Sequence, residues 1–300
     1  MQTSEFCVEN EDRLDKILKE RFPSYSRNYF QILIENGCVN INSVPAKKRH
    51  VPKEGDTVSI TFLPKKEIEL KAQKIPLNIL YEDDCILCIN KPFGMVVHPA
   101  PGHPDHTFVN ALLFHCKNLP FSKEDCRPGI VHRLDKNTSG VLIAAKNREA
   151  HQNLITLFET HQVKKQYLAI CIGNPGDMEI TSPVGRHPIY RKKMTTTEKG
   201  KSAITHIKTV KKGRLFSLVQ ATPVTGRTHQ IRVHLSSKGF AILGDETYGN
   251  IKINQKFGAA RQFLHAHTLS LPHPTKNKKL LLNAPLASDM ERAIEKLIPS

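Results

Sequence analysis

Residues 129–146, GIVHRLDKNTSGVLIAAK, place the charged segment His132-Arg133-Leu134-Asp135 between two apolar runs that are typical of buried strands. A carboxylate on a turn between buried strands is held rigidly, which suits a reactive group better than a solubilising one. Partial burial disfavours a bare carboxylate unless a cation lies beside it. We expect this cation to be Arg227, which is predicted to open a helix after Thr225-Gly226, with Arg232 further along it. The alternative is an ordinary turn with a surface ion pair.

The chain of 300 residues is long enough for one large domain and one small domain. The charged stretch PKKEIELKAQKIP, residues 64–76, is bounded by prolines and is typical of a linker. It predicts a small domain over residues 12–63 and a larger one over residues 77–300. The small domain should contain a helix capped by Asp12, a second helix from Ser26 to Gly37, and two short strands around a basic loop.

The larger part mixes strands and helices without the regular alternation of a doubly wound fold. Strands are expected at residues 85–90, 94–98, 141–146, 166–173, 202–210, 214–221 and 280–284. Helices are expected at residues 107–116, 148–160, 228–237 and 289–298. The stretch VKKGR is typical of a hairpin turn. These patterns predict an α+β fold with a mixed, largely antiparallel central sheet and flanking helices.

The net charge of +16 is unevenly distributed along the chain. Only 13 basic and 11 acidic residues precede position 75, so about +14 of the excess lies beyond it. This favours a nucleic acid as partner over a merely soluble basic protein. Seven cysteines without framework spacing fit a reducing compartment. Because no apolar run approaches about 18 residues and no targeting segment is evident, we expect a cytoplasmic protein without membrane contact. We also expect it to be a monomer.

Three stretches of the N-terminal part, RLDKIL, SRNYFQILIENGCVNINS and VPKEGDTVSI, resemble the alpha-L RNA-binding domain named after ribosomal protein S-four. The resemblance implies that the second helix and the adjoining loop contact structured RNA. The basic loop residues Lys47, Lys48 and Arg49 are then the expected RNA-binding residues. The alternative is a small appendage that binds no ligand.

Four stretches of the larger part occur in the order HRLDKNTSGVLIAAKN, KKQYLAI, VTGRTHQIRVHLSSKGFAILGDETYG and RQFLHAHTLSLPHP. Together they resemble the RluA family of RNA pseudouridine synthases, with the RluD-like branch closer because of the N-terminal domain. The resemblance implies an isomerase that converts uridines to pseudouridines in RNA, most often large-subunit ribosomal RNA, after flipping the nucleotide into a pocket. It implies no cofactor. The alternatives are a transfer-RNA pseudouridine synthase and a catalytically inert ribosome-assembly factor.

The resemblance also implies roles for individual residues. Asp135 is the nucleophile, and Arg227 is its ion-pair partner. Tyr167 lies against the base and is a candidate for proton removal. Arg133 fills the space that the flipped base leaves, and Leu264 forms an apolar floor under the ring.

A metal site is the competing interpretation of three histidines, His98, His103 and His106, in VVHPAPGHPDH. No cysteine or fixed ligand spacing supports it. We therefore expect no metal.

Overall fold

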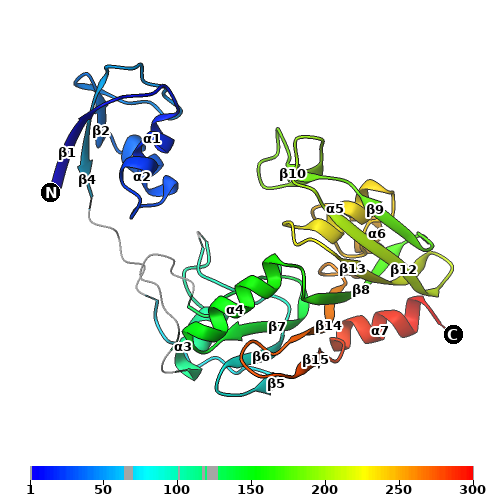
Figure 1. The fold of residues 1–300 in the computed structure, drawn as a ribbon. Coiled ribbons are helices and arrows are strands. Elements are labelled where there is room, and N and C mark those ends of the chain that lie inside the picture. Colours follow the sequence, from blue (N-terminus) through cyan, green and yellow to red (C-terminus); the bar gives the residue numbers. More distant parts are fainter. Residues whose placement is uncertain (1, 64–69, 101, 117–118, 120–127, 300) are drawn as a thin grey trace. The chain divides into compact units, whose positions relative to one another are not determined.

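The computed structural model describes residues 2–63, 70–100, 102–116, 119 and 128–299 (Figure 1). These residues form two compact units, Met1–Ile68 and Glu69–Ser300. Most of the expected linker lies outside the described residues. Its described end, from Leu70 onward, belongs to the second unit, where Lys71 and Gln73 bind Asn110 through backbone and side-chain hydrogen bonds.

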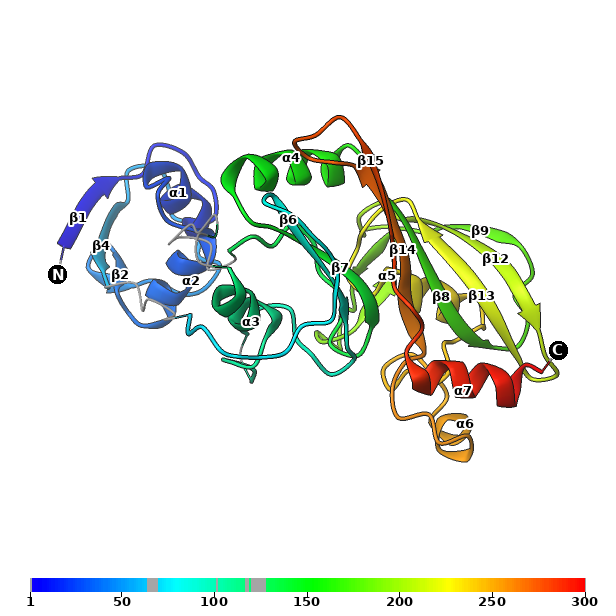
Figure 2. The same ribbon diagram turned by 90° about the horizontal axis from the view of Figure 1, so that it is seen from below.

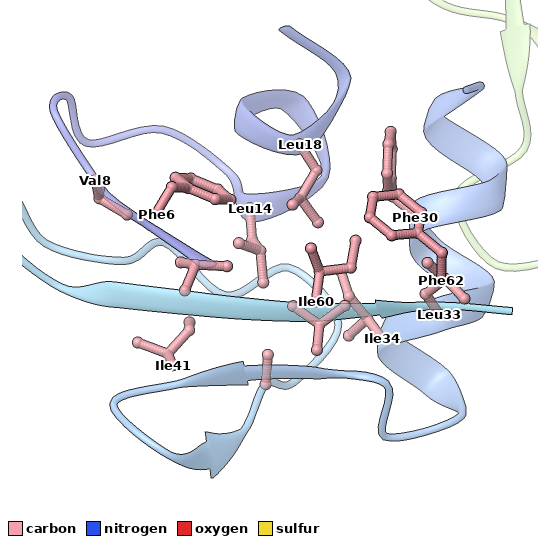
Figure 3. Packing of buried hydrophobic residues seen from close by; sticks show 13 residues of the cluster. Phe6, Val8, Leu14, Leu18, Phe30, Leu33, Ile34, Ile41, Ile60 and Phe62 are labelled. Atoms are coloured by element: carbon pink, nitrogen blue, oxygen red, sulfur yellow. The ribbon is translucent and has the colours of Figure 1, made fainter. Parts of the chain in front are cut away.

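The first unit packs two helices on an antiparallel sheet with the strand order β1-β4-β2-β3. Its elements are β1 (Gln2–Cys7), α1 (Leu14–Arg21), α2 (Arg27–Glu35), β2 (Val39–Ile41), β3 (Val44–Pro45) and β4 (Thr57–Phe62). Figure 3 shows Leu14 and Leu18 of α1 and Phe30 and Leu33 of α2 packed over Ile60 of β4. The sheet includes β1, which precedes the start at residue 12 that the sequence suggested.

The helix ends of the first unit follow side-chain chemistry. Ser26 Oγ accepts a hydrogen bond from the Tyr29 amide at the start of α2, as expected. Gly37 adopts a positive φ of 69° just beyond the end of this helix. Asp12 is not the cap of α1. That position belongs to Arg13, and the Asp12 carboxylate binds the Arg13 amide and Lys16 instead.

The second unit is built on a nine-stranded sheet with the order β5-β6-β7-β14-β8-β13-β12-β9, and β15 pairs with β14. Its strands are β5 (Ile79–Glu82), β6 (Ile86–Lys91), β7 (Ser139–Ala145), β8 (Lys164–Ile172), β9 (Met178–Thr181), β12 (Ile204–Lys212), β13 (Phe216–Pro223), β14 (Leu264–Pro272) and β15 (Lys279–Asn283). A separate two-stranded hairpin is formed by β10 (Val184–Arg186) and β11 (Met194–Thr196). All neighbours in the large sheet are antiparallel except β7 and β14. The expected mixed, largely antiparallel sheet is therefore confirmed.

Helices cover both faces of this sheet, so that its central strands are apolar on both sides. They are α3 (Phe108–His115), α4 (Arg148–Glu159), α5 (Gln230–Ser237), α6 (Ile251–Lys256) and α7 (Ser288–Leu297). On β7, Val141 and Ile143 pack toward α4, whereas Leu142 and Ala144 pack toward α3. Figure 2 shows α4 and α3 on opposite sides of β6 and β7. The strand β8 alternates in the same way, with Ala169 on the side of α5 and Ile170 on the side of α7.

The strand expected at residues 94–98 does not form. Gly94 has a φ of 83°, and the segment continues into prolines that cannot donate to a ladder. The carbonyl groups of Val96 and Val97 instead accept hydrogen bonds from the first amides of α3. This segment is therefore a support for a helix N-terminus.

Two residue pairs alone, His265 with Ser139 and Ala266 with Gly140, join β14 to β7. Gly140 has a φ of 113°, and a Cβ added to it would lie 2.2 Å from the Ala266 carbonyl oxygen. Backbone of one strand thus occupies the space that a side chain at position 140 would need.

Gly140→Ala is therefore expected to lower the free energy of unfolding by about 3 kcal/mol or more, since the strands must separate to admit the methyl group. Gly239→Ala is the matched control, because Gly239 has a φ of 85° and an added Cβ there would meet no atom within 4 Å. Urea unfolding of both variants measures the difference. Equal destabilisation would contradict the close approach at this seam.

Candidate active site

The Asp135 carboxylate lies on the loop that leads into β7, and two fully or largely buried side chains hold this loop. Lys91, with no exposed surface, donates from Nζ to the carbonyl oxygens of Pro92, Met95 and Lys136 at 2.9 to 3.1 Å. His132 Nε2 accepts from the Ile143 amide at 3.0 Å. Burial lowers the pKa of Lys91 to about 7 and that of His132 to about 3, so His132 is a neutral acceptor.

Arg232 of α5 is the cation beside Asp135. Its Nη1 donates to Asp135 Oδ2 at 2.8 Å, while Nε and Nη2 form a two-pronged contact with Asp245 at 2.7 and 2.9 Å. Arg232 is 6% exposed and Asp245 is fully buried. Although burial opposes it, the contacts with Asp245 and Asp135 raise the pKa of Arg232, so the guanidinium stays charged.

The expected pairing of Asp135 with Arg227 is wrong. Arg227 precedes α5, and its Nε donates to the Ser202 carbonyl oxygen at 3.0 Å. The helix begins only at Gln230, because His229 adopts a left-handed conformation with a φ of 56°. Arg227 is therefore outside the helix, and Arg232, in its first turn, takes the role that the sequence had assigned to Arg227.

A cavity of about 520 Å³ contains five of the residues predicted from the sequence: Asp135, Tyr167, Arg133, Arg227 and Leu264. They come from the loop before β7, from β8, from the segment before α5 and from the start of β14. Leu264 is 4% exposed and Arg133 is exposed. The volume suits a nucleobase with part of its sugar.

Tyr167 extends from β8 into this cavity. Burial raises the pKa of Tyr167, and the charge of Asp135 raises it further. The phenol is therefore protonated at neutral pH and can donate a hydrogen bond to a bound base. Any proton removal by Tyr167 requires that it first lose this proton to another group.

The sequence did not single out four residues of the site: Lys91, Asp245, His229 and Tyr248. Lys91 could have been noticed as a lysine in the apolar run ILCINK that is followed by proline. Asp245 and Tyr248 lie in GDETYG, where no periodic signal marks them. Their role depends on the contact with α5, which local sequence does not reveal.

The predicted RNA-binding residues of the first unit, Lys47, Lys48 and Arg49, lie between β3 and β4 and are exposed. Lys48 forms an ion pair with Glu35 of α2. These residues belong to a different unit from the cavity. Their role in RNA binding stays a prediction.

Two of the three histidines considered as metal ligands, His103 and His106, lie beside charged groups. His103 Nε2 lies 3.4 Å from Lys136 Nζ, and His106 Nδ1 lies 3.1 Å from Asp105. Among the residues that the structure describes, a different trio, Glu82, His115 and Cys116, places ligand atoms within 4.8 Å of one another. Lys146 Nζ binds Glu82 there at 2.7 Å, which makes this group an ion-pair cluster.

None of the helices in the described part of the chain has the length and apolar character of a membrane span.

Comparison with known proteins identifies the family. The family model described as RNA pseudouridylate synthase matches residues 85–237. An uncharacterized RNA pseudouridine synthase of Bacillus subtilis is 40% identical over 288 residues, covering 95% of this chain and 94% of the relative. Ribosomal large subunit pseudouridine synthase D of Zymomonas mobilis is 39% identical over 300 residues, covering 96% and 94%.

Solved structures agree with this match. Human RNA pseudouridylate synthase domain containing 4 is 27% identical, with a TM-score of 0.58 over 73% of this chain and 92% of that one. Human RNA pseudouridylate synthase domain containing 1 has the same TM-score at 25% identity. The chain therefore belongs to the RNA pseudouridylate synthase family and is an isomerase that acts on RNA. Within this family, the resemblance to the RluA type and its RluD-like branch is confirmed.

Proposed function

We propose that this protein isomerises specific uridines of large-subunit ribosomal RNA to pseudouridine in the cytoplasm, with Asp135 as the nucleophile. The observation that carries the proposal is the Asp135–Arg232–Asp245 chain at the edge of a cavity of about 520 Å³. Relatives named ribosomal large subunit pseudouridine synthase D, at 37 to 39% identity, support ribosomal RNA as the substrate.

The reaction breaks the bond from uracil N1 to sugar C1′ and forms a bond from uracil C5 to C1′. The proton on C5 is lost, and N1 gains one, so no electrons enter or leave. An anionic carboxylate can form the transient covalent bond, either to C1′ or to the base ring. Arg232 donates its hydrogen bond to Oδ2 of Asp135, which leaves Oδ1 for the attack.

The other cavity residues have complementary roles. Tyr167 lies against the base, Leu264 supports it, and Arg133 and Arg227 contact the RNA at the rim. Extrusion of the base from its stack costs a few kcal/mol, which binding of the flanking RNA must offset.

The direct test is a map of pseudouridines in ribosomal and transfer RNA from cells with and without this protein. The loss of defined sites in large-subunit ribosomal RNA, restored by wild-type protein and not by Asp135→Asn, is expected. Loss confined to transfer RNA would replace the proposed substrate. An unchanged map in both RNAs would argue for the inert assembly factor.

We further propose that the basic loop of the first unit binds structured RNA. Replacing Lys47, Lys48 and Arg49 together with glutamine is expected to weaken binding to large ribosomal RNA fragments about tenfold, because phosphate contacts are lost. Glutamine is uncharged but still polar, so it removes the phosphate contacts without adding an apolar surface. Turnover of a short single-stranded substrate should stay within about twofold, since that RNA fills only the cavity. Filter binding and single-turnover assays measure both, and unchanged affinity for large RNA would refute this role.

A further inference from the structure

A second side chain faces the proposed nucleophile. His229 Nε2 lies 3.8 Å from Asp135 Oδ1, on the oxygen that Arg232 does not bind. This distance exceeds that of a hydrogen bond. Catalytic hydrogen bonds are often long in the absence of substrate, and a small rotation of the carboxylate would shorten this one.

The imidazole ring is fixed from the other side. Its Nδ1 lies 2.8 Å from Tyr248 Oη, and the two rings pack edge to face with centroids 5.7 Å apart. The backbone of His229 is also held in the left-handed region, which residues other than glycine adopt at a cost in free energy. Residues that are kept in such a conformation cluster at functional sites.

The hydrogen-bond chain selects the tautomer of this ring. The Met194 amide donates to Tyr248 Oη at 2.8 Å. The Tyr248 hydroxyl proton then has His229 Nδ1 as its acceptor among the described residues. An imidazole that accepts at Nδ1 and is neutral carries its proton on Nε2, the atom that faces Asp135.

The charges around the ring favour its neutral form. Burial lowers the pKa of His229, and although Asp135 and Asp245 oppose this effect, Arg232 and Arg133 add to it. A neutral ring also avoids placing a second full cation beside Arg232.

From this geometry we infer that His229 is a positioning residue, which directs an Nε2–H group at Asp135 Oδ1 and, with Arg232 on Oδ2, sets the orientation of the carboxylate for attack. The alignment of the carboxylate matters because a displacement of about 1 Å can cost a factor of about 100 in rate. Tyr248 acts through His229 by holding the tautomer. Nothing in the family match assigns either role, and the effect on rate rests on the proposed function.

Two substitutions separate positioning from mere structural support. His229→Gln keeps an N–H group near the place of Nε2, whereas His229→Asn can replace only Nδ1 and cannot reach Asp135. Asparagine tolerates a positive φ better than glutamine does, so a purely structural role predicts that Asn is the milder change. The positioning role predicts the opposite. The kcat of His229→Asn falls about 10- to 100-fold, that of His229→Gln recovers at least partly, and the KM of both variants is nearly unchanged. A milder effect of Asn on kcat, or a loss expressed in KM, would overturn the inference.

A second measurement reports on the full-length protein without any turnover. Nitrogen-15 NMR of the histidine rings distinguishes the two neutral tautomers, and the His229 signals are those that vanish in His229→Gln or, if that variant fails to fold, in His229→Asn. We expect the Nε2–H form at neutral pH, and a mixture of tautomers in Tyr248→Phe. An Nδ1–H form in the wild type would overturn the inference. If the wild type forms no pseudouridine in any RNA, the proposed function fails, but the tautomer is still measured.

Discussion

Asp135→Asn is expected to reduce pseudouridine formation by at least about 1000-fold, because asparagine lacks the anionic oxygen that attacks the nucleotide. The fold should survive. Arg232 retains both hydrogen bonds to Asp245, and the Asp135 side chain is already 22% exposed, so the stability should fall by only about 1 kcal/mol. Single-turnover assays with unmodified ribosomal RNA measure the rate.

Binding of RNA provides the control for this variant. The affinity of Asp135→Asn for the same RNA should match that of the wild type within a few fold, since phosphate contacts dominate binding. Asp105→Asn removes an equal charge at an exposed site outside the cavity and should keep full activity. Turnover by Asp135→Asn near the wild-type rate would remove Asp135 from its assigned role.

Arg232→Met is expected to have the largest effect on stability, about 3 to 5 kcal/mol, together with loss of activity. It removes the cation from two carboxylates, of which Asp245 has no exposed surface, and a buried charge without its partner is costly. Methionine fills much of the space of the arginine stem, so lost packing contributes little. Urea unfolding measures the change.

Arg227→Met is the matched control, because Arg227 lies just before α5 and, among the described residues, its guanidinium donates to a backbone carbonyl oxygen instead of a carboxylate. It should change the free energy of unfolding by less than about 1 kcal/mol. Any loss of activity in this variant should appear as weaker RNA binding at the rim of the cavity. Similar destabilisation by both substitutions would contradict the ion-pair assignment.

The sequence predicted much of the fold because local patterns determine it. Apolar runs along β6, β7 and β13 and helical periodicity in α4 and α7 were sufficient to place these elements near their observed bounds. The strand β14 was not predicted. It is a central strand, yet it carries His265 and Thr268. The buried His265 is tolerated because its Nδ1 lies 2.9 Å from Ser139 Oγ on β7 and its Nε2 lies 3.3 Å from the Ala284 carbonyl oxygen. A pattern of residue types along one strand does not reveal such a partner.

The site was predicted in the same uneven way. Asp135, Tyr167 and Leu264 follow from the family motifs, and the cavity brings them together. The choice between Arg227 and Arg232 depends on the residue at which α5 begins. That residue is set by the left-handed backbone of His229. A glycine in the sequence would have indicated such a conformation, whereas a histidine does not.

The short ladder between β7 and β14 has a mechanical consequence. Side-chain hydrogen bonds connect residues 135–139 to the other half of the sheet. Arg232 binds Asp135, Arg261 binds the Asn137 carbonyl oxygen, Gln262 binds Thr138, and His265 pairs with Ser139. The loop that carries Asp135 is thus held by hydrogen bonds across the two strands of the sheet that share the fewest backbone pairs. A separation of β7 from β14 would displace the Asp135 carboxylate while the packing within each half of the sheet is still intact. We therefore expect heating or pressure to abolish the activity below the temperature or pressure at which the protein unfolds.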